Sequence, residues 1–213
     1  VNGQEVDELE DRAIKTVIVK SAPISRMYYA GQYVEGQSNP PTCWSPDTNV
    51  GRPSKDVARD DVQSLSCFDC RQNIKGSGMG VGRACKFQQR IAILLGDKDG
   101  KISSKEIYQL SLPATSIFGN DKQKMGLQAY ARFLNSQERP VPLATLVTEI
   151  CFDLDNNTPK LLFRPLRVLE EDEMDIAIEI QRADTTQEFI KFDTQFANPI
   201  NEDLYKAEDV FEE

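Results

Sequence analysis

The stretch Cys67-Phe68-Asp69-Cys70 is a Cys-x-x-Cys knuckle, whose short turn can point two thiolates at one metal ion. Cys43 precedes the knuckle and Cys85 follows it, so four of the five cysteines lie in one polar part of the chain. Four thiolates complete a tetrahedral zinc site and leave no coordination position for water or substrate. The pattern therefore predicts a structural Zn²⁺ site at Cys43, Cys67, Cys70 and Cys85.

Two other states of these thiols are compatible with the sequence. Two disulfides would use the same four cysteines, and unlinked reduced thiols would need no partner. No signal peptide is recognisable, which disfavours disulfides, and Cys151 lies in an apolar run as an ordinary buried thiol does. The loop between Cys43 and Cys67 is polar and has little apolar material to fold around, which favours a metal.

The charge of the chain is segregated along its length. The formal net charge is -9, but residues 1–14 carry five acidic residues against one arginine, and residues 170–213 carry fifteen acidic residues against three basic ones. Residues 15–169 hold 21 basic and 14 acidic residues. A basic body with acidic ends indicates a surface for a polyanion and an acidic segment that competes for it. An acidic terminal helix that only aids solubility fits the same counts.

Strands are predicted where β-branched and aromatic residues cluster between turn signals. Residues 15–22 (KTVIVKSA) and 26–34 (RMYYAGQYV) have this composition. Two hairpins are also predicted, one joining residues 90–96 and 107–113 and one joining residues 145–154 and 160–168.

Helices are predicted where apolar residues recur three or four positions apart. Residues 115–137 show this spacing cleanly from Lys124 onward, and residues 170–190 are apolar on one face and acidic on the other. Strands and helices in this order predict an α+β, mainly β fold, namely an OB-fold-like barrel with an open antiparallel sheet bearing helices on one face as the alternative. The predicted parts are an acidic N-terminal segment at 1–14, the barrel at 15–169 with a zinc-binding insertion at 36–86, and an acidic C-terminal helix and tail at 170–213.

Basic and aromatic residues near the cysteines predict a surface for single-stranded nucleic acid, which binds in basic grooves with rings on which bases stack. Glycines alternate along residues 73–83 (NIKGSGMGVGR), a pattern that does not match the phosphate loops of nucleotide-hydrolysing proteins but offers backbone N–H groups beside cations. Trp44 is the favoured stacking residue, because it lies in a polar loop beside a predicted metal ligand. The alternatives are that most of the aromatic rings pack in the core and that the glycine segment is only a flexible connecting loop. The predicted contacts are Arg26, Tyr28, Tyr33, Trp44, Lys75, Arg83, Lys86 and Arg90.

No catalytic constellation is visible in the sequence. The chain has no histidine, which removes His-based triads and the usual catalytic zinc sites. Glu149, Asp153 and Asp155 resemble a carboxylate site for magnesium, but a hairpin turn explains them better. The sequence therefore predicts a protein that is not an enzyme.

Several segments resemble a set of bacteriophage proteins. The segments are residues 40–47 (PPTCWSPD), 67–70 (CFDC) with 72–78 (QNIKGSG), 82–86 (GRACK), and the later YQLSLPATSIFG, LQAYARFL and TPKLLFRP, so the likeness covers residues 16–168. The resemblance implies binding of single-stranded DNA in phage replication or recombination. Phage single-stranded DNA-binding proteins combine an oligonucleotide-binding barrel, sometimes with a zinc-bearing insertion, and an acidic C-terminal tail, and this chain is similar in all three respects.

The leading hypothesis is therefore a protein that coats single-stranded DNA without base preference in the cytoplasm of an infected bacterium. The resemblance also implies that the acidic tail, with Glu208, Asp209 and Phe211, recruits phage replication proteins, although the tail ends in two glutamates rather than in an aromatic residue. The second hypothesis is a phage structural or adaptor protein that binds other proteins, and a metal-dependent nuclease is the third. No apolar run has the length of a membrane span, so no membrane partner is expected.

Overall fold

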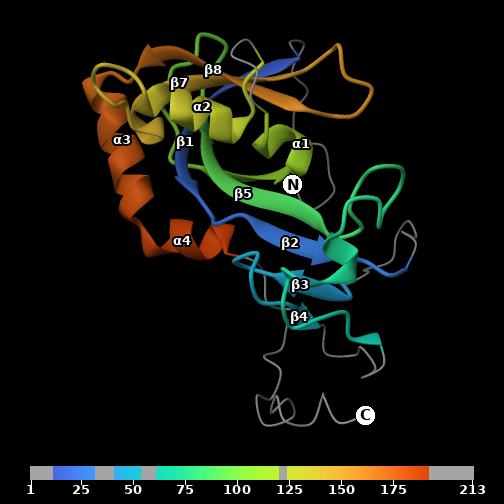
Figure 1. The fold of residues 1–213 in the computed structure, drawn as a ribbon. Helices are drawn as coiled ribbons and strands as arrows, with labels where there is room; N and C mark the ends of the chain where they lie inside the picture. Colours follow the sequence, from blue (N-terminus) through green and yellow to red (C-terminus); the bar gives the residue numbers. More distant parts are fainter. Residues whose placement is uncertain (1–11, 32–40, 54–60, 120–123, 192–213) are drawn as a thin grey trace. The chain divides into compact units, whose positions relative to one another are not determined.

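The computed structural model describes residues 12–31, 41–53, 61–119 and 124–191 (Figure 1). The chain divides into two compact units. Unit 1 comprises Val1–Ala22 and Gln89–Lys191, and unit 2 comprises Pro23–Gln88 and Phe192–Glu213. Unit 2 therefore contains all of the predicted cysteine-bearing insertion.

The described residues of unit 1 contain a sheet of five strands in the order β6-β5-β1-β7-β8. The pairs β1·β5, β1·β7 and β7·β8 are antiparallel. The strands are β1 (Ala13–Ser21), β5 (Lys86–Leu95, of which the first three residues belong to unit 2), β6 (Ile107–Pro113), β7 (Leu146–Phe152) and β8 (Leu161–Val168). Both predicted hairpins are present, and the predicted strand at residues 15–22 is β1.

The turn between β5 and β6 shows why these strands end where they do. The Asp97 carboxylate accepts hydrogen bonds from the backbone N–H groups of Asp99 (2.9 Å) and Lys101 (2.8 Å). Gly100 has a φ of 83°, a conformation that glycine adopts without strain. The side chain and the glycine together close the Asp-Gly turn that the sequence predicts.

Helices pack on both faces of the unit 1 sheet (Figure 1). On one face, α3 (Glu171–Arg182) and α4 (Asp184–Ile190) bury Ala177, Ile180 and Ile190 against Val17 and Val19 of β1. On the other face lies α2 (Leu127–Asn135), preceded by the short helix α1 (Ala114–Ile117). The hydroxyl groups of Tyr130 in α2 and Thr148 in β7 lie 2.9 Å apart, and the Tyr130 ring stacks on Phe163 with 6.2 Å between centroids.

The predicted barrel is not formed, because the described strands of unit 1 do not close on themselves and leave β6 and β8 as edges. The free edge of β8 is protected against further strand pairing. Its Phe163 N–H donates to the Met125 carbonyl oxygen (3.0 Å), its Leu161 N–H donates to the Ser116 hydroxyl (2.9 Å), and Pro165 has no N–H to offer. The coarser prediction of an antiparallel, mainly β fold with helices is confirmed.

The predicted helix at residues 170–190 is two helices. The chain leaves the helical conformation at Ala183, where φ is -63° and ψ is 132°, and α4 begins at the next residue. The Thr186 hydroxyl donates to the Ile180 carbonyl oxygen at 2.6 Å and joins the two helices across the break. The tail at residues 192–213 lies outside the described residues.

Unit 2 has little regular structure in its described part. It contains β2 (Ser25–Tyr28), β3 (Cys43–Ser45) and β4 (Arg52–Pro53), with β3 between β2 and β4, and a 3-10 turn, η2 (Arg71–Asn73). The predicted strand at residues 26–34 corresponds to β2, which ends at Tyr28. The described part of unit 2 buries few apolar side chains, namely Pro41, Trp44, Cys43, Cys67, Cys70 and Cys85.

Candidate metal centre and nucleic-acid interface

The structure brings the four predicted zinc ligands together. Cys43 begins β3, Cys67 and Cys70 precede η2, and Cys85 precedes β5. All four are buried, all four line one pocket in unit 2, and none forms a disulfide. Cys151, in contrast, lies in β7 of unit 1.

Backbone hydrogen bonds fix the loops that carry the cysteines. The Cys67 N–H donates to the Asn49 carbonyl oxygen at 2.8 Å, and the Cys85 N–H donates to the Gln72 carbonyl oxygen at 2.9 Å. The Asn73 side-chain amide also donates to the Cys67 carbonyl oxygen at 2.6 Å. Segments that are far apart in the sequence are thus held around one pocket.

The surroundings of Cys43 and Cys85 oppose the loss of their thiol protons. Burial, and then the neighbouring thiols of Cys85, Cys67 and Cys70, raise the pKa of Cys43 to about 12. Burial also raises the pKa of Cys85, against the opposing effect of the positive charge of Arg26. A divalent metal would supply the positive charge that four thiolates need.

Four buried thiols are the donor set of the tetrahedral sulfur sites that bind Zn²⁺, and also of sites that bind iron. Among the described residues, no group of three or more His, Cys, Asp or Glu side chains is arranged so that it could hold a metal ion as it stands. The four cysteine side chains must therefore turn toward one another to bind one ion. Zinc binding at these four cysteines is therefore a proposal.

The prediction that Trp44 stacks on bases is wrong for this structure. The Trp44 side chain is only 5% exposed, because β3 lies between β2 and β4 and pairs Trp44 with Met27 and Arg52. Arg26 is only 7% exposed, so it also has no surface on which to meet a phosphate. Both residues belong to the interior of unit 2.

The other predicted contacts are distributed differently. Lys75, Arg83 and Lys86 are exposed in unit 2, and Tyr28 is partly exposed and lines the cysteine pocket. Arg90 belongs to unit 1, where its guanidinium donates to the Lys191 carbonyl oxygen. Tyr33, Glu208, Asp209 and Phe211 lie outside the described residues.

The glycine segment is a hydrogen-bonded loop rather than an open cradle for phosphate. The N–H groups of Gly76 (2.9 Å) and Gly78 (3.1 Å) both donate to the Gly82 carbonyl oxygen, and the Gly82 N–H donates to the Met79 carbonyl oxygen (3.1 Å). These three N–H groups are already used within the loop. Contacts to a phosphate backbone would therefore come from side chains.

Four exposed apolar residues next to the cysteines were missed by the sequence reasoning. Phe68 is 90% exposed and Met79 is 93% exposed, and Ile74 and Val81 are exposed as well. The sequence signal for Phe68 was its place between the two cysteines of the knuckle. We use the name knuckle surface for the eight exposed residues Phe68, Arg71, Ile74, Lys75, Met79, Val81, Arg83 and Lys86.

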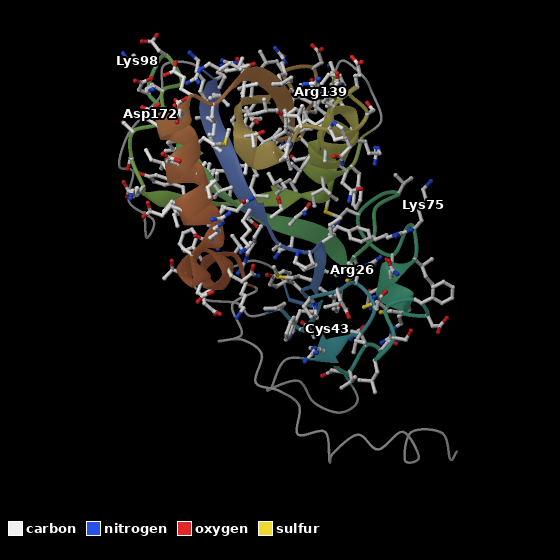
Figure 2. The ribbon with its side chains drawn as sticks, turned by 90° about the vertical axis from the view of Figure 1, so that its left-hand side faces the viewer. Arg26, Cys43, Lys75, Lys98, Arg139 and Asp172 are labelled. Carbon is white, nitrogen blue, oxygen red and sulfur yellow. The ribbon has the colours of Figure 1, made fainter. Side chains whose placement is uncertain are left out.

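The knuckle surface is strongly basic. Within residues 68–86, Asp69 is the one acidic residue, and no further acidic residue follows before Asp97. In Figure 2, Arg26 and Cys43 lie near each other within unit 2, and Lys75 extends outward from its loop. The segment that carries two of the four cysteines thus also carries an exposed ring and several exposed cations.

Comparison with known proteins gives no relative for this chain. No family model matches it, and neither the curated proteins nor the solved structures contain a match. In the part of the chain that the structure describes, no helix is long and apolar enough to cross a membrane.

Proposed function

We propose that this protein binds single-stranded DNA without sequence preference, as a non-enzymatic component of phage DNA replication or recombination. The knuckle surface is the proposed contact, and a structural Zn²⁺ at the four cysteines holds it in shape. The observation that carries the proposal is the position of Phe68, an almost fully exposed ring between two buried cysteines in a segment whose exposed Lys75 and Lys86 form no ion pair among the described residues.

The charges of the knuckle surface are available to a ligand. Lys75 and Lys86 form no ion pair among the described residues, whereas Lys101, Lys105 and Lys124 of unit 1 are all paired with carboxylates. Cations without an internal partner can neutralise phosphates and release counterions. Phe68 supplies a face on which a base can stack, which favours an unpaired strand over a duplex.

The proposed zinc would stabilise unit 2 and take no part in chemistry. Apart from Pro41 and Trp44, the apolar side chains buried in the described part of this unit are the four cysteines themselves. So small an apolar core contributes little hydrophobic free energy, and small units of this kind depend on a metal or on disulfides. Four thiolates also leave zinc no open position for water.

The remaining expectations from the sequence belong to the same proposal. The acidic tail, with Glu208, Asp209 and Phe211, would compete with DNA for the knuckle surface and recruit replication proteins once DNA displaces it. The protein would act in the cytoplasm of an infected bacterium. An oligonucleotide-binding barrel is not required, because the proposed contact lies in unit 2.

Fluorescence anisotropy of a labelled single-stranded oligonucleotide of about 20 nucleotides, titrated over a salt series, tests the proposal. The affinity should fall with salt at a log-log slope of about -0.7 per phosphate contacted. The double variant Lys75→Ala/Lys86→Ala should weaken binding and make the slope shallower by about 1.4, whereas Lys98→Ala/Arg139→Ala, which removes two exposed cations from unit 1, should not. Salt-independent binding, or equal losses in the two double variants, would contradict the proposal.

A protein-binding adaptor is the second candidate, and the aliphatic part of the knuckle surface favours it. Ile74, Met79 and Val81 are exposed in one short segment and cannot stack as aromatic rings do. If this candidate is right, the protein should associate with itself or with a protein partner in sedimentation experiments without DNA. Met79→Ser/Val81→Ser should then abolish the association, and oligonucleotides should not bind.

A further inference from the structure

In the part of the chain that the structure describes, Arg26 is a buried cation without a carboxylate partner. Its side chain is 7% exposed, its Cζ lies 3.9 Å from the centre of the Phe87 ring, and its guanidinium donates to the side-chain oxygen of Asn73. Among the described residues it forms no ion pair, and its Nε–H has no hydrogen-bond partner. Arginine stays protonated in proteins, so a buried guanidinium needs a negative charge nearby.

The cysteine pocket is where that negative charge would arise. Arg26 lines the pocket together with all four cysteines, and its positive charge acts to lower the pKa of Cys85. Four thiolates on one Zn²⁺ carry a net charge of two minus, which a buried site must offset. A buried arginine without a carboxylate partner can offset this negative charge. Four neutral thiols would leave the arginine without an opposite charge.

We propose that Arg26 is the counter-charge of the zinc–thiolate centre, an inference that rests on the proposed zinc site. It donates a hydrogen bond to Cys85 Sγ and withdraws electron density from that sulfur. Asn73 fixes its orientation, since the same amide side chain also donates to the Cys67 carbonyl oxygen at 2.6 Å. Arg26 is thus a positioning residue that makes the metal bind more tightly and its thiolates react less readily with electrophiles.

Arg52 provides a matched control within the same unit. Its guanidinium also lies over an aromatic ring, with Cζ 5.5 Å from the centre of the Trp44 ring, but the residue is exposed and does not line the pocket. Its effect on the pKa of Cys43, which it lowers, comes from the backbone N–H, a group that a substitution keeps. Arg52→Met therefore removes an arginine from unit 2 without removing a charge from the cysteine pocket.

The test measures zinc affinity by competition with a chromogenic chelator, and the rate of zinc release during alkylation with iodoacetamide. Arg26→Met should weaken zinc binding about 10- to 100-fold and speed release, and Arg52→Met should leave both unchanged. Arg26→Lys, which keeps the charge, should fall between the wild type and Arg26→Met, and it serves as the test variant if Arg26→Met does not fold.

The outcomes separate this inference from the proposed function. A wild-type protein that binds no zinc would overturn the metal site and the inference with it. A wild-type protein that binds zinc tightly, with Arg26→Met binding as tightly and releasing zinc as slowly, would overturn the role of Arg26 alone. Arg26→Lys behaving as poorly as Arg26→Met would show that charge is not the cause.

Discussion

Glu173 and Arg167 form a two-point ion pair whose carboxylate is completely buried. The two nitrogen–oxygen distances are 2.6 and 2.7 Å, and the Glu173 oxygens also accept the backbone N–H groups of Ile102 (2.9 Å) and Glu170 (2.8 Å). Arg167 further donates to the Gly100 carbonyl oxygen at 2.8 Å. The pair therefore ties the start of α3 to β8 and to the loop that follows β5.

The stability of unit 1 should depend on pH through Glu173. The guanidinium of Arg167 is the main reason that the pKa of Glu173 is lowered from its usual 4.5 to about 2. A lowered pKa in the folded state means that the stabilisation is complete above about pH 4.5 and is lost as the pH falls toward 2. Urea unfolding followed by circular dichroism should show this loss, and Glu173→Gln should lower the free energy of unfolding at neutral pH by about 3 kcal/mol.

Glu179 is the matched control for this prediction. It pairs with Lys105 at 2.6 Å, but its side chain is 60% exposed, so solvent screens the interaction. Glu179→Gln should change the free energy of unfolding by less than about 1 kcal/mol. Equal effects of the two substitutions would show that the buried pair does not stabilise the start of α3.

Zinc removal should unfold unit 2 and spare the core of unit 1. Trp44, the only tryptophan, is buried in unit 2, so its emission should shift to longer wavelength when a chelator is added. Cys43→Ser should lose the metal, whereas Cys151→Ser should still bind one zinc per chain, as measured by metal analysis. Retention of zinc by Cys43→Ser, or unchanged Trp44 emission after metal removal, would contradict the predicted site.

Gly51→Ala should disrupt the cysteine pocket for a steric reason. A Cβ atom at Gly51 would lie 2.2 Å from the Ser64 carbonyl oxygen and 3.6 Å from the sulfur of Cys43. Gly76 has no atom within 4 Å of a built Cβ, but its φ of 88° makes alanine strained there by about 1 kcal/mol. Gly51→Ala should therefore lower zinc affinity much more than Gly76→Ala, and the reverse order would count against the observed packing.

Phe68→Ala should weaken oligonucleotide binding without loosening unit 2. A stacked base contributes about 1 to 3 kcal/mol, so the affinity should fall roughly 5- to 150-fold. Phe133→Ala, which removes a partly exposed ring from α2 of unit 1, is the control and should bind as the wild type does. Anisotropy titrations at one salt concentration measure both variants, and an unchanged affinity for Phe68→Ala would remove the ring from the interface.

The strands of unit 1 could be predicted because local sequence determines them. Val17, Ile18 and Val19 form a β-branched run that is buried on both faces, and the Asp-Gly turn closes the hairpin through Asp97 and Gly100. The break at Ala183 could not be predicted in the same way. The apolar pattern continues through it, and tertiary packing of α4 decides where the helix ends.

The candidate site was predictable in its cysteines and not in its surface. The spacing of the cysteines in the sequence was enough to predict that Cys67 and Cys70 lie close to Cys43 and Cys85. In the structure all four line one pocket. Exposure depends on strand pairing that the sequence does not show, so Trp44 became buried between β2 and β4 while Phe68 stayed outside. The polar residues around Trp44 in the sequence therefore did not indicate which of the two rings is exposed to solvent.

We propose that Zn²⁺ holds unit 2 in the shape that binds an unpaired strand. The most direct measurement titrates zinc into metal-free protein in the presence of a labelled single-stranded oligonucleotide and follows its anisotropy. We predict that binding rises with added zinc and saturates at one ion per chain. Equal oligonucleotide affinity with and without zinc would show that the metal does not support strand binding, and no binding in either state would show that this protein does not bind single-stranded DNA.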